Sequence, residues 1–591
     1  MNRTEQTEAL GRLSMALVGA LAGLAMWMLS DVLPDLLTEA PRLYLFLSAL
    51  AWVLFSAWLA MAGPLSLAVA GALAAALALP AAGLLAWASL RFDTTAAFFQ
   101  TGHPLVSFGL LSAVPLPFVI AWKRAGQWNS YPQLFQQSWN IVVRYAAAWL
   151  FVGTVWAVLT LSDALLKLVG IDVIEWLLEQ EVVPYLLTGV TLGLALAVVN
   201  ELSDYVSPYL VLRLLRLLLP VVLAVVLVFL AALPMRGLSN LFGEFSAAAT
   251  LLAMAMGALT LVTTALDADD EAAVQSGAMR LAAQVLALLV PALAVLAGEA
   301  IRMRVVQYGW SPDRLAAATL AAVVLGYGLA YALAVLRRRN WAARIRQANI
   351  VMALAVIALA LAWLTPLIDP QKLATAHQVA RFRAGAVGAR QLDLWTIGRE
   401  WGRAGRAGLD RLAALSDHPE AALLAERLAA LDEAPTRYAF ERQTAEADSA
   451  ALIAALRAKL PVRPEGAALP EGLLEGLRSW ELEELSRACG RSTPGGNPGC
   501  VLLRVELSDA TPGDEAVLVT GSDRGGPVLR GYFAEEGGAG LVMRVPEVLA
   551  SAGGLRTGAA VVDDLIAGEF SLRPVAINAL VFEGGELFFG R

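Results

Sequence analysis

The chain has 591 residues, of which 58% are hydrophobic and 16% are charged, and its net charge is −7 at pH 7. Soluble domains contain about 25% charged residues, so this balance excludes an ordinary soluble protein and indicates a membrane protein. No basic domain and no basic stripe interleaved with aromatic residues occurs, which argues against nucleic-acid binding. Only four of the 44 basic residues are lysine, a bias typical of GC-rich bacterial genomes.

Apolar runs long enough to cross a hydrocarbon core of about 30 Å follow one another through the first 369 residues. The first has no clear small-x-small cleavage site and is interpreted as a retained anchor. Gly63 and Pro64 alone join the second run to the third, so these form either a tight hairpin of two spans or one bent helix. The eleven predicted spans are 13–30, 43–62, 65–88, 105–122, 145–166, 182–199, 217–233, 246–266, 281–300, 315–336 and 349–368.

The distribution of basic residues favours one orientation of these spans. With the N-terminus in the cytoplasm, thirteen basic residues lie on the inner side of the spans and seven on the outer side. Short basic loops resist translocation, so a cytoplasmic N-terminus is expected. An odd number of spans then predicts a bacterial inner-membrane protein whose C-terminal domain is periplasmic.

The first span contains Gly19 and Gly23 at the spacing that lets a neighbouring helix approach closely. The alternative is a chance pair in a glycine-rich chain. Further along, residues 127–145 place four aromatic side chains before a span, as an interfacial helix in the headgroup layer does. The acidic stretch 267–271 is expected to be a solvated loop.

Polar residues near the membrane form the candidate functional positions. In the segment 298–314, Glu299 ends a span and Arg302, Arg304, Tyr308 and Arg314 follow it. Glu299 and Arg302 have the spacing of a helical ion pair. An intramembrane ion pair is a candidate functional site, whereas an interfacial pair only fixes helix ends. Both interpretations stay open.

Two further groups of polar residues are candidates. Asn200, Glu201 and Asp204 form a polar break at a cytoplasmic helix end. Asp31 and Asp35 lie in the first exported loop, where either would be a weak candidate for a catalytic base or metal ligand.

Hydrophobic runs stop after residue 369, which predicts a transmembrane helical domain over 1–369 and an exported domain beyond it. The exported domain is divided into a helical part over 370–490 and a β-rich part over 491–591. Cys489 and Cys500 are the only cysteines in the chain and flank a turn-rich stretch. Export permits a disulfide between them, while a metal site or two free thiols are the alternatives.

Local patterns predict the elements of this domain. Helical spacing covers 391–415, 418–432, 445–459 and 471–488. Short β-prone runs at 501–507, 515–521, 526–533, 540–545, 570–582 and 586–590 predict a small sheet, with Gly584 and Gly585 turning the last two strands into a hairpin. The fold class is therefore an α-helical polytopic membrane protein with a C-terminal α+β domain. No zinc signature, phosphate-binding loop or Ser/His/Asp constellation occurs there, so no cofactor or metal is expected.

Three stretches carry a family resemblance: LLPVVLAVVLVFLAALPMRGLSNLFG, AAATLLAMAMGALTLVTTALDADDE and above all RMRVVQYGWSPDR. They resemble the bacterial membrane-protein family catalogued as domain of unknown function 4153, over about residues 10 to 410. The family usually has leucine where Trp310 stands. The resemblance implies a multi-pass membrane fold and no particular activity.

Three functional hypotheses follow. The leading one is a non-enzymatic envelope scaffold or sensor, anchored in the lipid bilayer, that binds a periplasmic protein partner through residues 370–591. A second is a transporter or transport-associated subunit in which Glu299, Arg302 and Arg304 line a path. The third is a lipid-linked glycosyl or phospho-group transferase that uses Asp31 or Asp35. The sequence does not decide the oligomeric state.

Overall fold

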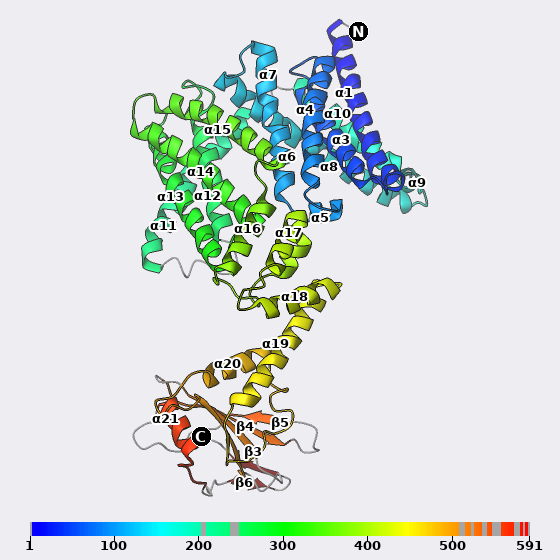
Figure 1. Ribbon diagram of the computed structural model, residues 1–591. Coiled ribbons are helices and arrows are strands. Elements are labelled where there is room, and N and C mark those ends of the chain that lie inside the picture. Colours follow the sequence, from blue (N-terminus) through cyan, green and yellow to red (C-terminus); the bar gives the residue numbers. More distant parts are fainter. Residues whose placement is uncertain are drawn as a thin grey trace. The chain divides into compact units, whose positions relative to one another are not determined.

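The computed structural model divides the chain into two compact units, unit 1 (Met1–Ala425) and unit 2 (Glu426–Arg591) (Figure 1). The described residues are 3–201, 208–236, 247–507, 515–521, 525–534, 541–545, 557–572, 579–582 and 585–588.

Unit 1 is helical throughout its described part. Its first half contains α1 (Arg3–Trp27), the π-helical turn η1 (Met28–Val32), α2 (Leu33–Leu36), α3 (Pro41–Met61), α4 (Leu67–Ser89), α5 (Thr95–Phe99), α6 (His103–Ala113), α7 (Pro115–Ala125), α8 (Tyr131–Lys167), α9 (Val173–Leu178) and α10 (Val182–Glu201). The second half contains α11 (Pro208–Arg236), α12 (Ala247–Leu266), α13 (Gly277–Tyr308), α14 (Pro312–Leu336), α15 (Trp341–Leu364), α16 (Pro370–Arg383), η3 (Thr396–Glu400) and α17 (Gly402–Ala413), and α18 (Ala421–Glu433) contains the boundary between the units.

Eleven helical segments among the described residues are long and apolar enough to cross a membrane, and each coincides with one predicted span. The protein is therefore a multi-pass membrane protein. The pair whose number was open forms two helices, α3 and α4, which end and begin on either side of a short turn. Gly63 in this turn has φ +102°, a conformation that favours glycine because it lacks a Cβ.

Residues 127–145 do not form a separate interfacial helix. Instead, α8 is one continuous helix that starts at Tyr131, and Leu134 and Phe135 in its first turns are buried. Phe135 packs with Leu212 of α11 and with Ala268 in the loop after α12. Phe135 therefore packs between helices, and the same aromatic spacing suits both this packing and the headgroup layer.

The glycine pair of the first span packs against a second glycine pair, Gly189 and Gly193 of α10. A Cβ added to Gly19 would lie 2.0 Å from the carbonyl oxygen of Gly189, and one added to Gly193 would lie 2.3 Å from that of Met15. No side chain fits at these distances, so the two backbones touch. The predicted close approach is confirmed, with α10 as the partner.

Two main clusters of buried apolar side chains hold the helices of unit 1 together. One joins α11 to α15, with Leu286, Val290 and Tyr331 fully buried. The other joins α1, α3, α4, α7, α8 and α10 around Met61 and Leu196. Alanine contributes many of these contacts, because small side chains allow close helix packing in a membrane.

Residues 370–425 belong to unit 1. Asp369 accepts a hydrogen bond from the Lys372 amide (3.0 Å) and so caps α16. The helix predicted over 391–415 is broken into η3 and α17, because Gly402 at its middle has φ +59°. A Cβ on Gly408 of α17 would lie 2.1 Å from the Thr375 methyl group, so α17 packs closely on α16.

Unit 2 is built around a five-stranded sheet in the order β1-β2-β3-β4-β5. Its elements are α19 (Arg437–Lys459), β1 (Val462–Arg463), α20 (Ser479–Cys489), β2 (Cys500–Val505), β3 (Glu515–Thr520), β4 (Val528–Ala534), β5 (Leu541–Arg544), α21 (Gly558–Ala567), β6 (Ala579–Phe582) and β7 (Gly585–Phe588). The last two strands pair as the predicted antiparallel hairpin, in which Gly584 lies outside the described residues.

Different helices pack on the two faces of this sheet. Leu502 and Leu518 pack on one face with apolar residues of α19 and α20. On the other face Val501 and Val519 pack against Val562 of α21. Sequence patterning predicted neither β1 nor α21, because one is only two residues long and the other follows a run of glycines.

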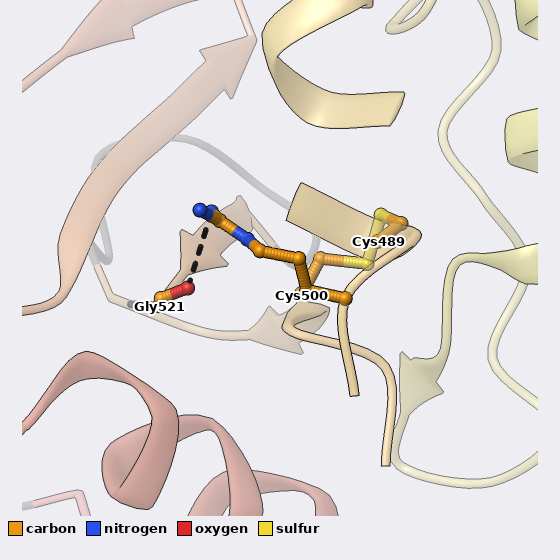
Figure 2. Close-up of a disulfide and its surroundings, with 4 residues drawn as sticks. Cys489, Cys500 and Gly521 are labelled. Carbon is orange, nitrogen blue, oxygen red and sulfur yellow. Dashed lines mark hydrogen bonds between the residues drawn. A yellow bond between two sulfur atoms is a disulfide. The ribbon is translucent and has the colours of Figure 1, made fainter. Parts of the chain in front are cut away.

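The structure joins Cys489 and Cys500 in the disulfide that the sequence predicted (Figure 2). The bond ties the last residue of α20 to the first residue of β2, and both cysteines are buried. A covalent link at this point holds α20 at the edge of the sheet core.

Replacing Gly189 with leucine should separate α1 from α10, because the new side chain meets backbone rather than a movable side chain. Overpacking of this kind costs about 1–3 kcal/mol or more. Thermal unfolding of the purified protein in detergent should therefore begin at a lower temperature than in the wild type.

Gly153→Leu is the matched control, because a Cβ at Gly153 of α8 meets nothing within 4 Å. Equal unfolding temperatures for the two variants would contradict the importance of the α1–α10 contact.

Candidate functional site

The family-like string RMRVVQYGWSPDR forms the turn between α13 and α14, and α16 packs on it. Gln378 Nε2 donates to the carbonyl oxygens of Tyr308 (2.9 Å) and Trp310 (3.1 Å). The Trp310 amide donates to Nδ1 of His377 (3.2 Å), and Arg381 Nη2 donates to the carbonyl oxygen of Gln307 (3.1 Å). The string is therefore the docking surface for α16.

The charged residues predicted around this turn do not converge on an enclosed site. Glu299 and Arg302 do form the predicted ion pair (2.6 Å), but their side chains are 35% and 63% exposed on the surface of α13. The guanidinium groups of Arg304 and Arg314 lie 5.9 and 5.4 Å from the centre of the Tyr308 ring. This arrangement fixes the end of a helix.

The polar break at the end of α10 also makes structural contacts. Glu201 forms an ion pair with Arg12 of α1 (2.5 Å), which adds to the glycine contact between these helices. The Asn200 amide lies against Gly63 of the α3–α4 turn. Asp204, the third predicted residue, lies outside the described residues.

Asp31 lies in η1 and Asp35 in α2, and both are exposed. In the described part of the chain no group of three or more His, Cys, Asp or Glu residues is placed to hold a metal ion. Neither carboxylate therefore belongs to such a group among the described residues.

A charged network that the sequence did not predict lies at the ends of α11, α12 and α15. Asp267, expected in a solvated loop, is buried and forms an ion pair with Arg216. Arg346 Nη1 pairs with Asp270 (2.7 Å), and its Nη2 donates to the carbonyl oxygen of Leu266 (2.6 Å). Arg216 and Arg346 come from other helices and form ion pairs with carboxylates of this loop. The local sequence of the loop does not reveal these partners.

Another polar group joins α4, α6 and α15. Arg91 Nη2 donates to three carbonyl oxygens at and beyond the C-terminal end of α15, those of Trp363 (2.9 Å), Thr365 (2.7 Å) and Ile368 (3.2 Å). The Trp363 indole donates to Nδ1 of His103 (2.9 Å). Burial lowers the pKa of Arg91, and Asp369 partly offsets this effect. These contacts join α6 and the segment after α4 to the C-terminal end of α15.

Unit 2 contains a groove of about 950 Å³ beside β4 and β5. Tyr532 of β4 lines it and is 5% exposed, and burial raises the pKa of its hydroxyl while the neighbouring Arg530 lowers it. Arg530 donates to Glu484 of α20 (3.1 Å) and lies 5.9 Å from the centre of the Trp480 ring. The groove is therefore bounded by the start of α20 and the outer strands.

Among the described residues, no helix covers the apolar side of this groove. Met543 pairs with Tyr532 across the ladder, so it lies on the same sheet face as α20. Leu541 and Val545 share that face because side chains alternate along a strand. α19 and α20 pack on this face over β2, β3 and β4, whereas the residues from β5 are exposed. The exposed fractions are 37% for Leu541, 46% for Met543, 69% for Val545 and 54% for Trp480.

These four residues, Trp480, Leu541, Met543 and Val545, are called the apolar shelf. Among the described strands, β5 also has a neighbour on one side only. An edge strand beside exposed apolar side chains is a surface that other chains pair with. The sequence predicted the strand but not the shelf, because only the register of β4 and β5 places these residues together.

A family model described as domain of unknown function (DUF4153) matches residues 42–412. The match covers more than half of the chain, so the protein belongs to this family. It confirms the resemblance drawn from the sequence. No curated protein and no solved structure matches the chain.

Protonation of His377 should loosen the contact between α16 and the α13–α14 turn. Burial and then the neighbouring Arg381 lower the pKa of His377 in the folded protein. A group whose pKa falls on folding stabilises the fold above its unfolded pKa of about 6.5, and this contribution is lost as the pH falls. Hydrogen exchange of α16 amides, corrected for intrinsic rates, should show less protection at about pH 5.5 than at about pH 7.5.

His377→Gln is the control, because glutamine keeps an acceptor for the Trp310 amide and does not titrate in this range. Protection in this variant should change less with pH. The same pH dependence in both proteins would rule out His377 as its source.

Proposed function

We propose that this member of the family is an inner-membrane anchor whose periplasmic unit 2 binds a partner protein, as an envelope scaffold or sensor does. The observation that carries the proposal is the apolar shelf beside the edge strand β5. Isolated exposed apolar residues are ordinary, but a contiguous group beside an edge strand favours association. The partner supplies an extended segment that adds to β5 and places alternate apolar side chains on the shelf.

Two observations support export of unit 2. The thirteen-to-seven asymmetry of basic residues favours a cytoplasmic N-terminus, and eleven spans then end outside. Both cysteines of the chain form a disulfide in unit 2, and disulfides persist in oxidising compartments such as the periplasm. Neither argument depends on the other.

The alternative of a transporter that uses Glu299, Arg302 and Arg304 has less support. The Glu299–Arg302 pair is exposed on the surface of α13 instead of lining an enclosed path. Residues that bind a substrate inside a membrane face the bundle interior or a water-filled cavity. The transferase alternative depends on Asp31 and Asp35, which no described metal-binding group accompanies.

A single engineered thiol tests the orientation, because the two native cysteines are bonded to each other. Tyr438 of α19 is 73% exposed, so Tyr438→Cys should react with a membrane-impermeant maleimide in intact spheroplasts. Gln127→Cys, between α7 and α8, should react only after lysis. The reverse pattern would overturn the periplasmic assignment.

A photo-reactive residue at Met543 should cross-link one predominant envelope protein in living cells, because the partner lies on the shelf. The same probe at Tyr438, which is exposed in the same unit but does not line the groove, should not yield that product. A second experiment moves the probe to Leu541 and adds the substitution Met543→Asp. The cross-linked product should fall about tenfold, because replacing a buried apolar contact at the centre of an interface costs roughly 1–2 kcal/mol or more of binding free energy.

Limited proteolysis of the Met543→Asp variant checks that unit 2 stays folded. Equal cross-linking from Met543 and Tyr438 would contradict the proposal. A product that contains two copies of this chain would assign the shelf to self-association instead.

A further inference from the structure

A cavity of about 630 Å³ lies inside unit 1 between α6, α7, α8, α12, α14 and α15. All six helices belong to segments that are long and apolar enough to cross the membrane. Apolar side chains such as Leu134, Phe118 and Ile350 form most of its wall. Val142, Met256 and Leu320 also line it and are 56%, 40% and 39% exposed, so the cavity opens at the outer surface of the bundle.

The position of this opening determines what fills the cavity. The outer surface of membrane-spanning helices faces lipid chains, and no water is present there to occupy an apolar opening. The cavity volume falls within the range of about 300–1,000 Å³ that small-molecule sites have. An acyl chain of a membrane lipid is therefore the molecule available to fill the cavity.

One end of the cavity is polar. The Tyr331 hydroxyl donates to Oδ1 of Asn349 (2.5 Å) and also contacts the Thr263 hydroxyl (2.9 Å). Asn349 Nδ2 donates to the Tyr131 hydroxyl (3.2 Å). These four side chains come from four helices and line the same cavity, so its polar end is built by the tertiary structure.

Several donors at this cavity have no acceptor within the described residues. The Tyr131 oxygen accepts from Asn349, but no described atom accepts its proton. The Tyr327 hydroxyl and the Trp139 indole, which also line the cavity, donate to no described atom. A donor that no protein atom satisfies favours a ligand with acceptor oxygens here.

We propose that this cavity binds one ester-linked membrane lipid, with an acyl chain along the apolar wall and an ester carbonyl accepting from Tyr327 or Tyr131. The apolar lining favours the acyl chain of the lipid. The side-chain donors without a protein acceptor favour its ester carbonyl. The site lies in unit 1 and does not depend on the partner proposed for unit 2. It makes the membrane unit a lipid-binding module.

The full-length protein in nanodiscs tests the two halves of this proposal separately. The first probe is a diester phosphatidylethanolamine, and the second is its diether analogue, which has the same headgroup and chain length but lacks the carbonyl groups. Native mass spectrometry counts the lipids retained after mild delipidation. We expect one diester lipid to be retained about five-fold more strongly than the diether lipid, because one hydrogen bond is lost.

Two variants locate the site. Tyr327→Phe should remove most of the preference for the diester lipid while keeping retention of either lipid. Ala353→Trp should fill the cavity and abolish retention, whereas Leu361→Trp on the same helix should leave it unchanged, since Leu361 is exposed and does not line the cavity.

The outcomes are distinct. Equal retention of the diester and diether lipids by the wild type overturns the role of the carbonyl. Retention by Ala353→Trp equal to that by Leu361→Trp overturns the site. Because the lipid comparison uses the wild-type protein, a variant that fails to fold does not remove the test.

Discussion

Water is absent from the bilayer core, so a polar group inside the spans of unit 1 is costly unless the protein or a lipid supplies a partner. This constraint accounts for where the polar side chains of unit 1 lie. Arg216 and Arg346 pair with carboxylates and carbonyl groups at the ends of the spans, and Arg91 caps the end of α15. Inside the bundle, Tyr331 and Asn349 satisfy each other. The donors left over at the cavity, of which Tyr327 is one, favour a ligand with acceptor oxygens there.

The same constraint explains how the helices are packed. Burial of apolar surface provides little driving force between helices that are already surrounded by lipid, so close backbone contact has to contribute. Gly19 and Gly193 allow α1 and α10 to touch, and the Arg12–Glu201 pair closes one end of that contact. At the α13–α14 turn the helices are joined by hydrogen bonds instead of close backbone contact. The carbonyl oxygens of the family string accept hydrogen bonds from side chains of α16. Unit 1 therefore extends beyond its last span to include α16 and α17.

Unit 2 obeys the rules of a water-soluble domain. Its sheet is covered by α19 and α20 on one face and by α21 on the other, and the buried disulfide fixes α20 to β2. The helix cover ends before β5, which leaves the apolar shelf exposed. Among the described strands, β5 is an edge strand, and the partner proposed for unit 2 would add to it.

The sequence by itself located the apolar runs and most strands, because hydrophobic length and residue alternation are local properties. It favoured the disulfide, but it left open whether residues 43–88 form two spans or one bent helix. It also identified the Glu299–Arg302 pair, since helical spacing is local. Only the tertiary structure decided that this pair is exposed, that Asp267 is buried, and that Tyr131, Asn349 and Tyr331 meet at a cavity. Those outcomes depend on which helices become neighbours, and no pattern within a single helix encodes its partner.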